Sequence, residues 1–438
     1  MRGAQTKSER PTGGCFFASF ILPEVQKPDT VGPSHAAKKE IRDGKRMSKL
    51  LLTPEQTLPQ DGTTGALAGR VWLPQVDGPS VVAIRADGVY DISARFPTMH
   101  DLCEQEDPAG AMRAVAGERI GDLASLLANT PEDNRDPHKP WLLAPIDLQA
   151  VKAAGVTFAI SMLERVIEEK ARGNAAAAAE IRKEIVALVG DDLSKLKPGS
   201  PEAMRLKDVL IKQGAWSQYL EVGIGPDAEI FTKSPSMSAV GTGFDAGLHP
   251  ISNWNNPEPE VVLVVSSDGR IVGGTLGNDV NLRDVEGRSA LLLGKAKDNN
   301  ASASIGPFIR FFDASFTLDQ MRHCVLSLTV EGTDSYVLKG SSRLDQISRD
   351  YTDLTAQMLN RNHQYPDGAV LFTGTLFAPI DDRDHPGEGF THKMGDVVTI
   401  ATPELGALVN RMKRSNDCAP WTFGTAQLMR NLAKRKLI

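Results

Sequence analysis

The sequence predicts an α+β fold, in which strands and helices occupy separate stretches of the chain. Three observations favour this class. Short β-rich runs begin after Met47, a helical block extends over residues 161–214, and many short β-rich runs follow residue 220. The chain of 438 residues is 41% hydrophobic and 24% charged, a composition that is typical of a protein with a large buried core.

The first 46 residues differ in composition from the rest. They carry nine Lys or Arg and five Asp or Glu, whereas the whole chain has a net charge of −6. The apolar run 15–22 could resemble the core of a signal peptide, but Pro23-Glu24 interrupts it and no small-x-small cleavage site follows. We therefore expect residues 1–46 to be a disordered tail or the product of an upstream start codon, and the protein to be cytoplasmic.

Residues 47–140 contain short β-rich runs at 70–72, 80–85 and 88–92. Asp87-Gly88 separates the last two runs and is typical of a hairpin turn. Helical patterns follow around 99–106 and 109–128. Farther along, the stretch 143–147 leads into a long helical region, and residues 154–158 are expected at the start of that region.

The block 161–214 has apolar residues at helical spacing around an alanine run. Gly190 would end one helix there. Ser200 is suited to cap the next helix, Pro201 to occupy its first position, and Gly214 to end it. We interpret this block as a structural or oligomer-facing insertion.

An acid-rich hairpin begins at residue 258. Glu258-Pro259-Glu260 precedes the apolar strand 261–265, Asp268-Gly269 forms a turn, and 270–277 returns. Alternate side chains share one face of a strand, so Glu258 and Glu260 point to one place. Symmetric pairing about the turn sets Asp279 opposite Glu258, with Cβ atoms roughly 5 Å apart.

Three carboxylates this close repel one another unless a cation neutralises them. Oxygen ligands alone favour Mg²⁺ or Mn²⁺ over zinc. The alternative is that Glu258 and Glu260 are solvated charges at a strand edge and that Asp279 caps a turn. The convergence of a third acid with the pair favours the metal site.

A set of motifs in fixed order resembles the fumarylacetoacetate hydrolase superfamily. The resemblance covers roughly residues 140–435, with a weaker match over 68–102. The stretches that carry it are 229–233, 277–286, 304–307, 373–375 and 394–398, together with Lys297. It implies a fumarylacetoacetase-like C-terminal domain over 141–438, built as a mixed β-sandwich or roll, and a smaller N-terminal β-containing domain over 47–140. It also implies a homodimer or homotetramer.

The resemblance also implies roles for individual residues. The family's metal-binding acids match Glu258, Glu260 and Asp279, which would hold Mg²⁺, with Mn²⁺ as an alternative. The family lysine matches Lys297 rather than Lys295, although the acid three residues later is replaced by Asn300. Residues expected to contact a small 2-oxo acid substrate are Thr375, Gly374, Ser161, Arg165 and Phe231. For Lys233, a place in the site and an exposed position after a strand both remain open.

One departure from the family pattern bears on the reaction. The C–C hydrolases of the family carry Asn-Tyr-x-x-His-x-x-Glu, whose His and Glu activate water, but Ser161 occupies the histidine position here. Serine has no basic group that titrates near neutral pH, so it cannot replace this histidine. The pattern around Thr157 and Arg165 instead resembles the branch that dehydrates 2-keto-3-deoxy sugar acids. Glu229 is then our candidate proton donor, beside Lys297 as the second catalytic group.

The leading function is therefore Mg²⁺-dependent dehydration of a 2-keto-3-deoxy sugar acid, a pentonate, to 2,5-dioxopentanoate. A C–C hydrolase of an acylpyruvate or diketo acid and a non-catalytic binding protein are the alternatives. A net charge of −6 argues against general nucleic-acid binding. No apolar run approaches the ~20 residues of a membrane span, and four scattered cysteines make no thiolate metal site.

Overall fold

The computed structural model describes residues 49–172, 174, 178, 181, 196–212, 214, 216–377, 379, 381–385 and 389–438. Contacts group Met47–Ile438 into one compact unit. The expected tail and the helix end at Gly190 lie outside the described residues. No helix in the described part of the chain is long and apolar enough to cross a membrane.

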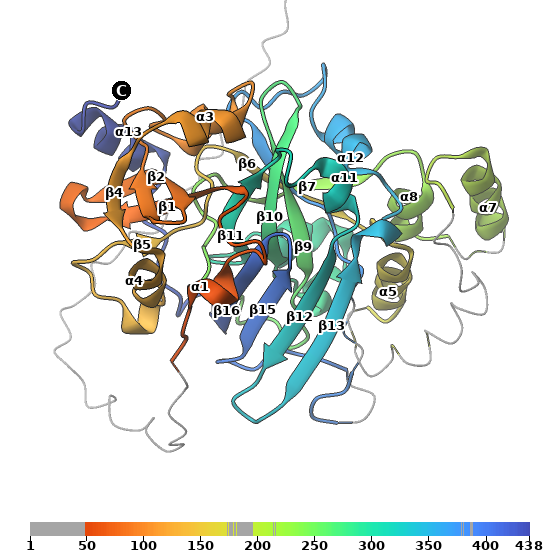
Figure 1. Ribbon diagram of the computed structural model, residues 1–438. Coiled ribbons are helices and arrows are strands. Elements are labelled where there is room, and N and C mark those ends of the chain that lie inside the picture. Colours follow the sequence, from red (N-terminus) through yellow and green to blue (C-terminus); the bar gives the residue numbers. More distant parts are fainter. Residues whose placement is uncertain are drawn as a thin grey trace, which may run out of the picture. The chain divides into compact units, whose positions relative to one another are not determined.

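Two β-sheets form the framework of the described residues (Figure 1). The larger sheet has the order β4-β3-β2-β1-β11-β10-β9-β14-β6-β7, with β5 paired to β1, and the smaller has the order β13-β12-β15-β16-β8. The larger sheet contains β1 (Ala66–Leu73), β2 (Gly78–Arg85), β3 (Gly88–Asp91), β4 (Glu118–Gly121), β5 (Trp141–Leu142), β6 (Ala150–Gly155), β7 (Glu229–Ser234), β9 (Pro259–Val265), β10 (Ile271–Asp279), β11 (Ala303–Phe311) and β14 (Ala369–Phe372). The smaller contains β8 (Asp245–Leu248), β12 (Val325–Glu331), β13 (Val337–Arg343), β15 (Val397–Thr402) and β16 (Gly406–Arg414). These sheets, with the helices that flank them, confirm the predicted α+β class.

Short helices connect and cover the sheets. They are α1 (Pro54–Thr57), α2 (Met99–Cys103), α3 (Pro108–Ala114), α4 (Leu123–Ala128), α5 (Ala159–Lys170), α7 (Pro201–Lys212), α8 (Gln218–Ile224), α9 (Arg283–Glu286), α10 (Leu293–Lys297), α11 (Leu318–Arg322), α12 (Tyr351–Met358) and α13 (Thr425–Lys434). The expected start of α7 is confirmed, because Ser200 Oγ accepts the Ala203 N–H at 3.2 Å and Pro201 is the first helical residue.

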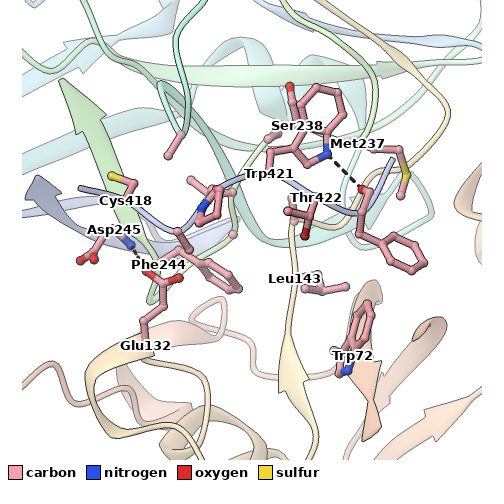
Figure 2. Close-up of a pocket in the computed structure, with 18 of the residues that line it drawn as sticks. Trp72, Glu132, Leu143, Met237, Ser238, Phe244, Asp245, Cys418, Trp421 and Thr422 are labelled. Atoms are coloured by element: carbon pink, nitrogen blue, oxygen red, sulfur yellow. Dashed lines mark hydrogen bonds between the residues drawn. The ribbon is translucent and has the colours of Figure 1, made fainter. Parts of the chain in front are cut away.

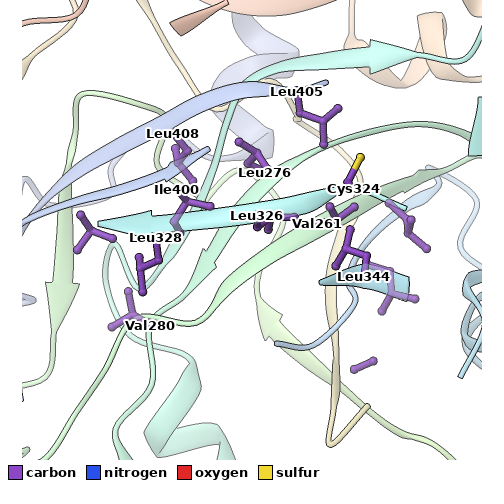
Figure 3. Packing of buried hydrophobic residues seen from close by; sticks show 14 of the residues in the cluster. Val261, Leu276, Val280, Cys324, Leu326, Leu328, Leu344, Ile400, Leu405 and Leu408 are labelled. Carbon is purple, nitrogen blue, oxygen red and sulfur yellow. The ribbon is translucent and has the colours of Figure 1, made fainter. Parts of the chain in front are cut away.

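Strand β9 is buried on both faces. Val261, Leu263 and Val265 pack in a cluster with residues of β12, β15 and β16, so this cluster lies between the two sheets (Figure 3). Val262 and Val264 belong to a second cluster, on the other face, with residues of α2 and α3. A continuous valine-rich run is what a strand covered on both faces requires. The acidic hairpin therefore begins at the centre of the fold.

One helix prediction is wrong. The predicted helix 109–128 is α3, then β4, then α4. Helix α3 ends at Ala114, because Val115 is already extended, and Asp122 caps α4 by accepting the Ser125 N–H at 2.8 Å. Pairing of β4 with β3 prevails here over local helix propensity.

The long helical region that residues 154–158 were expected to open begins with α5 at Ala159. Strand β6, which was not predicted from the sequence, precedes this helix and pairs with β14 and β7.

Candidate functional site

The β9–β10 hairpin brings three acidic side chains together. Asn278 pairs with Pro259 and Gly277 with Glu260, and the Asp279 N–H bonds the Glu258 carbonyl at 3.1 Å. This is the register expected from symmetric pairing about the turn, despite a shift between Ile271 and Gly273. Glu258, Glu260 and Asp279 are all buried, and each offers an oxygen within 4.8 Å of the other two. We call these three residues the carboxylate trio.

Two lysines neutralise part of the trio. Lys297 Nζ, at the end of α10, lies 2.6 Å from Glu258 Oε2 and 3.0 Å from Asp279 Oδ2. Lys233 Nζ, on β7, lies 2.8 Å from Asp279 Oδ1. Burial alone would lower the pKa of Lys297, but the carboxylates of Asp279 and Glu258 raise it, so this side chain stays positively charged. Asn300 bonds the carbonyls of Ser415 and Ala419 and takes no part in this compensation.

Glu260 is the member of the trio that pairs with no cation among the described residues. Its Oε2 accepts the Gly374 N–H at 2.7 Å. Gly374 has a φ of +87°, and a Cβ there would lie 2.0 Å from Thr157 Oγ1, so only glycine fits at this position. Burial, together with the charges of Asp279 and Glu258, raises the pKa of Glu260 well above its usual value.

Glu229 is the first residue of β7. It pairs with Gly155 of β6, and a Cβ on Gly155 would lie 2.1 Å from Glu229 Oε2. The bare backbone of Gly155 therefore makes room for this carboxyl group. Burial and then the charge of Glu286 raise the pKa of Glu229 to about 7.

Arg165 connects helix α5 to the trio. Its Nη2 bonds Glu258 Oε1, and its Nη1 lies 2.7 Å from Glu168 Oε2 and 3.4 Å from Glu286 Oε2. A second guanidinium, of Arg283 on α9, lies 2.7 Å from Glu168 Oε1. Arg283 thus turns toward α5, whereas its neighbour Asp284 accepts hydrogen bonds from Ser252 Oγ and the Asn253 N–H.

The remaining predicted residues are near this cluster or on its elements. Thr375 is buried, and its Oγ1 accepts the Phe377 N–H at 3.1 Å. The Phe231 ring centroid lies 5.7 Å from Lys297 Nζ. Ser161 is in α5, and its side chain is outside the described part of the chain.

Lys233 is a site residue that sequence reasoning left open, and Glu168 and Glu286 are site residues that it missed. Lys233 is fully buried, so the exposed alternative is wrong. A signal for it was present, because Glu229, Phe231 and Lys233 alternate and so share one face of β7. Glu286 had no such signal, since its place beside Arg165 depends on the packing of α9 against α5.

A cavity of about 310 Å³ opens elsewhere in the fold (Figure 2). Trp72, Leu143, Phe244 and Trp421 are among its lining residues, and none of the predicted site residues lines it. The candidate site is therefore defined by its charged side chains rather than by this cavity.

Comparisons with known proteins agree with this geometry. Residues 225–413, which include the trio, match the family model for the C-terminal domain of fumarylacetoacetate (FAA) hydrolase. A 189-residue segment is 30% identical to 2-dehydro-3-deoxy-D-arabinonate dehydratase of Saccharolobus solfataricus, covering 42% of this chain and 59% of that protein. A 192-residue segment is 30% identical to a probable 2-keto-3-deoxyxylonate dehydratase of Haloferax volcanii, covering 44% and 62%. The chain thus spans about three fifths of the length of these curated relatives.

Two solved structures share the fold. A 2-keto-3-deoxy-D-arabinonate dehydratase complexed with magnesium and 2,5-dioxopentanoate superposes with a TM-score of 0.56 at 21% identity, covering 80% of this chain and 99% of that chain. The apo form of that enzyme gives a TM-score of 0.55 at 22% identity, with the same coverage. Residues 225–413 are thus similar to the C-terminal domain of the fumarylacetoacetate hydrolase family, and the solved structures share the fold of this chain.

Proposed function

We propose that this protein is a Mg²⁺-dependent dehydratase that converts a 2-keto-3-deoxypentonate to 2,5-dioxopentanoate. The observation that carries the proposal is the buried carboxylate trio next to a charged Lys297, with Glu229 titrating near neutral pH in the same cluster. The curated relatives named as dehydratases of such acids support the choice of substrate class.

The trio suits a hard divalent cation. Its donors are all carboxylate oxygens, they lie within 4.8 Å of one another, and the buried carboxyl group of Glu260 has no cationic partner among the described residues. We propose that Glu258, Glu260 and Asp279 hold Mg²⁺, with Mn²⁺ as an alternative of similar ligand preference. When bound, the ion supplies a Lewis acid and a template for the carboxylate and keto oxygens of a 2-oxo acid.

Lys297 and Glu229 would carry out the remaining steps of the reaction. Lys297 keeps its positive charge and stabilises the negative charge that develops on the keto oxygen as the C3 proton passes to a water molecule. Glu229, protonated, donates its proton to the C4 hydroxyl, so that the C4–O bond breaks, a C3=C4 double bond forms and water departs. A proton shift from C5 to C3 then gives the C4=C5 enol. This enol loses its hydroxyl proton and gains a proton at C4, which leaves the aldehyde at C5.

The substrate contacts are proposals of the same kind. Thr375 would hold the substrate carboxylate, and Arg165, Ser161 and Phe231 would line the rest of the molecule. Gly374 acts through Glu260, because its N–H holds that carboxylate in place.

A substrate screen tests the proposal. Purified protein with Mg²⁺ would be given the 2-keto-3-deoxypentonates and, separately, an acylpyruvate, with EDTA-treated protein as the control. The expected result is a semialdehyde product from a deoxypentonate, dependent on the metal. Release of pyruvate from the acylpyruvate without semialdehyde formation would establish the hydrolase alternative instead.

A further inference from the structure

Both oxygens of the Glu258 carboxylate are already bound to cations. Oε1 accepts from Arg165 and Oε2 from Lys297. By contrast, Glu260 accepts the Gly374 N–H and pairs with no cation among the described residues. A metal ion that binds the trio must therefore either share the Glu258 carboxylate with the Arg165 guanidinium or displace that guanidinium from it.

Arg165 has a second carboxylate within reach. Glu286 Oε2 is buried and accepts no hydrogen bond, yet it lies only 3.4 Å from Arg165 Nη1. The same nitrogen lies 2.7 Å from Glu168 Oε2. A small rotation of the guanidinium toward Glu286 would keep its charge compensated after contact with Glu258 is lost.

Lys233 differs from Arg165 in this respect. Its ammonium is fully buried and donates to the carbonyls of Lys297 and Val280, at 2.6 and 3.2 Å. Backbone oxygens therefore fix Lys233 in place, whereas the Arg165 guanidinium is held by the acidic side chains of Glu168, Glu258 and Glu286. Arg165 is the cation that can move.

We infer that Arg165 is a positioning residue that competes with the divalent ion for Glu258 and passes to Glu286 when the ion binds. The inference rests on the proposed function, because it takes the trio as the metal site. This transfer couples metal binding to the side-chain contacts of helix α5, which carries Arg165 and Glu168. The Arg165 side chain would then take its final position beside the substrate only after the ion has bound.

Isothermal titration calorimetry with MgCl₂ tests this through a double-mutant cycle. At an effective dielectric of about 20, a guanidinium and a divalent ion on one carboxylate repel strongly, so Arg165→Met should lower the Kd for Mg²⁺ about tenfold or more. Glu286→Gln removes the second acceptor and should raise the Kd. In the double variant, Glu286→Gln should have almost no effect, because no guanidinium remains to be moved.

The controls separate this inference from simpler effects. Lys207→Met, on α7, breaks an ion pair with Glu221 in the same helical region and should leave the Kd within about twofold. Arg165→Gln replaces Arg165→Met if the latter does not fold, as judged from circular dichroism. An unchanged or higher Kd in the Arg165 variant overturns competition, and additive effects in the double variant overturn the transfer to Glu286. If the wild-type protein binds no Mg²⁺, the proposed metal site itself is wrong.

Discussion

Glu229 is half-buried and Glu286 is buried, and the two carboxyl groups interact electrostatically. Burial raises the pKa of both, and the charge of Glu286 adds to the effect at Glu229, whose pKa reaches about 7. A carboxyl with this pKa is substantially protonated at neutral pH, whereas an exposed glutamate is not. Glu229 can therefore serve as a proton donor under ordinary conditions.

Replacing Glu229 tests this role. Glu229→Gln keeps the shape of the side chain but has no acidic proton, so turnover of a 2-keto-3-deoxypentonate should fall by about 10²–10⁴-fold. KM should change little, because the metal and Thr375 would hold the other end of the substrate. Steady-state kinetics measures both. Normal turnover of the Glu229→Gln variant would show that another group donates the proton.

The pH dependence of turnover should follow the same carboxyl group. As pH rises through about 7, Glu229 loses its proton and the rate should fall. Glu286→Gln removes a negative charge that disfavours ionised Glu229, so the pKa of Glu229 and the midpoint of this fall should move to lower pH. A kcat profile from pH 5 to 9 shows the shift. Glu221→Gln, an acid paired with Lys207, should leave the midpoint unchanged.

At the scale of elements, the β9–β10 hairpin was predictable because its information is local. The turn at Asp268-Gly269 and the apolar run before it set the register, and the register places Glu258 across from Asp279. The helix predicted over 109–128 failed because β4 forms by pairing with β3, a partner about thirty residues away. Hydrophobic periodicity in the sequence indicates the type of a single element, but it carries no information about which distant strand that element pairs with.

The candidate site divides in the same way. The proposed metal-binding acids lie on one hairpin and were named from the sequence. Arg165, Glu168 and Glu286 meet because α5 and α9 pack together, more than a hundred residues apart in the chain. The family resemblance pointed to Arg165 but not to its acidic partners.

The pairing of β6 with β7 gives a test at this scale. Gly155→Ala would place a Cβ 2.1 Å from Glu229 Oε2, so this flexible carboxyl group must move. Turnover should fall toward that of Glu229→Gln, while the melting temperature should drop by only a few degrees. Gly294→Ala is the matched control, since its Cβ would meet nothing within 4 Å, and it should keep full turnover. Unchanged turnover of Gly155→Ala would show that the position of this carboxyl group does not matter.

At the scale of the whole molecule, the larger sheet continues across the expected domain boundary at residue 140. Strand β1, before this boundary, pairs with β11, after it. The division into domains 47–140 and 141–438 therefore stays a prediction. The expected homodimer or homotetramer also stays a prediction, and light scattering can measure the oligomeric state.

A chain that begins at Met47 should behave like the full chain. The basic, Pro- and Gly-containing composition of residues 1–46 offers no apolar core, and removing such a terminus costs little stability. Melting temperature and turnover should both be retained. A large loss of either would show that this segment contributes to the structure.

Removing metal should leave the fold intact. Arg165, Lys233 and Lys297 already compensate Glu258 and Asp279, so metal-free protein keeps few uncompensated buried charges in the trio. Ligand binding stabilises the folded state only by RT ln(1 + [L]/Kd), which is about 2.7 kcal/mol at a hundredfold excess over Kd. EDTA should therefore abolish turnover and lower the melting temperature by a few degrees. Unfolding on chelation would contradict this.

Under the proposed function, the three cations around Glu258 and Asp279 would also separate synthesis of the protein from supply of an ion. In small metal-dependent domains, folding waits for the metal. Here the newly made chain would complete its structure first and acquire magnesium later. In a cell short of magnesium, idle but intact protein would persist and resume work once the ion returned, without new translation.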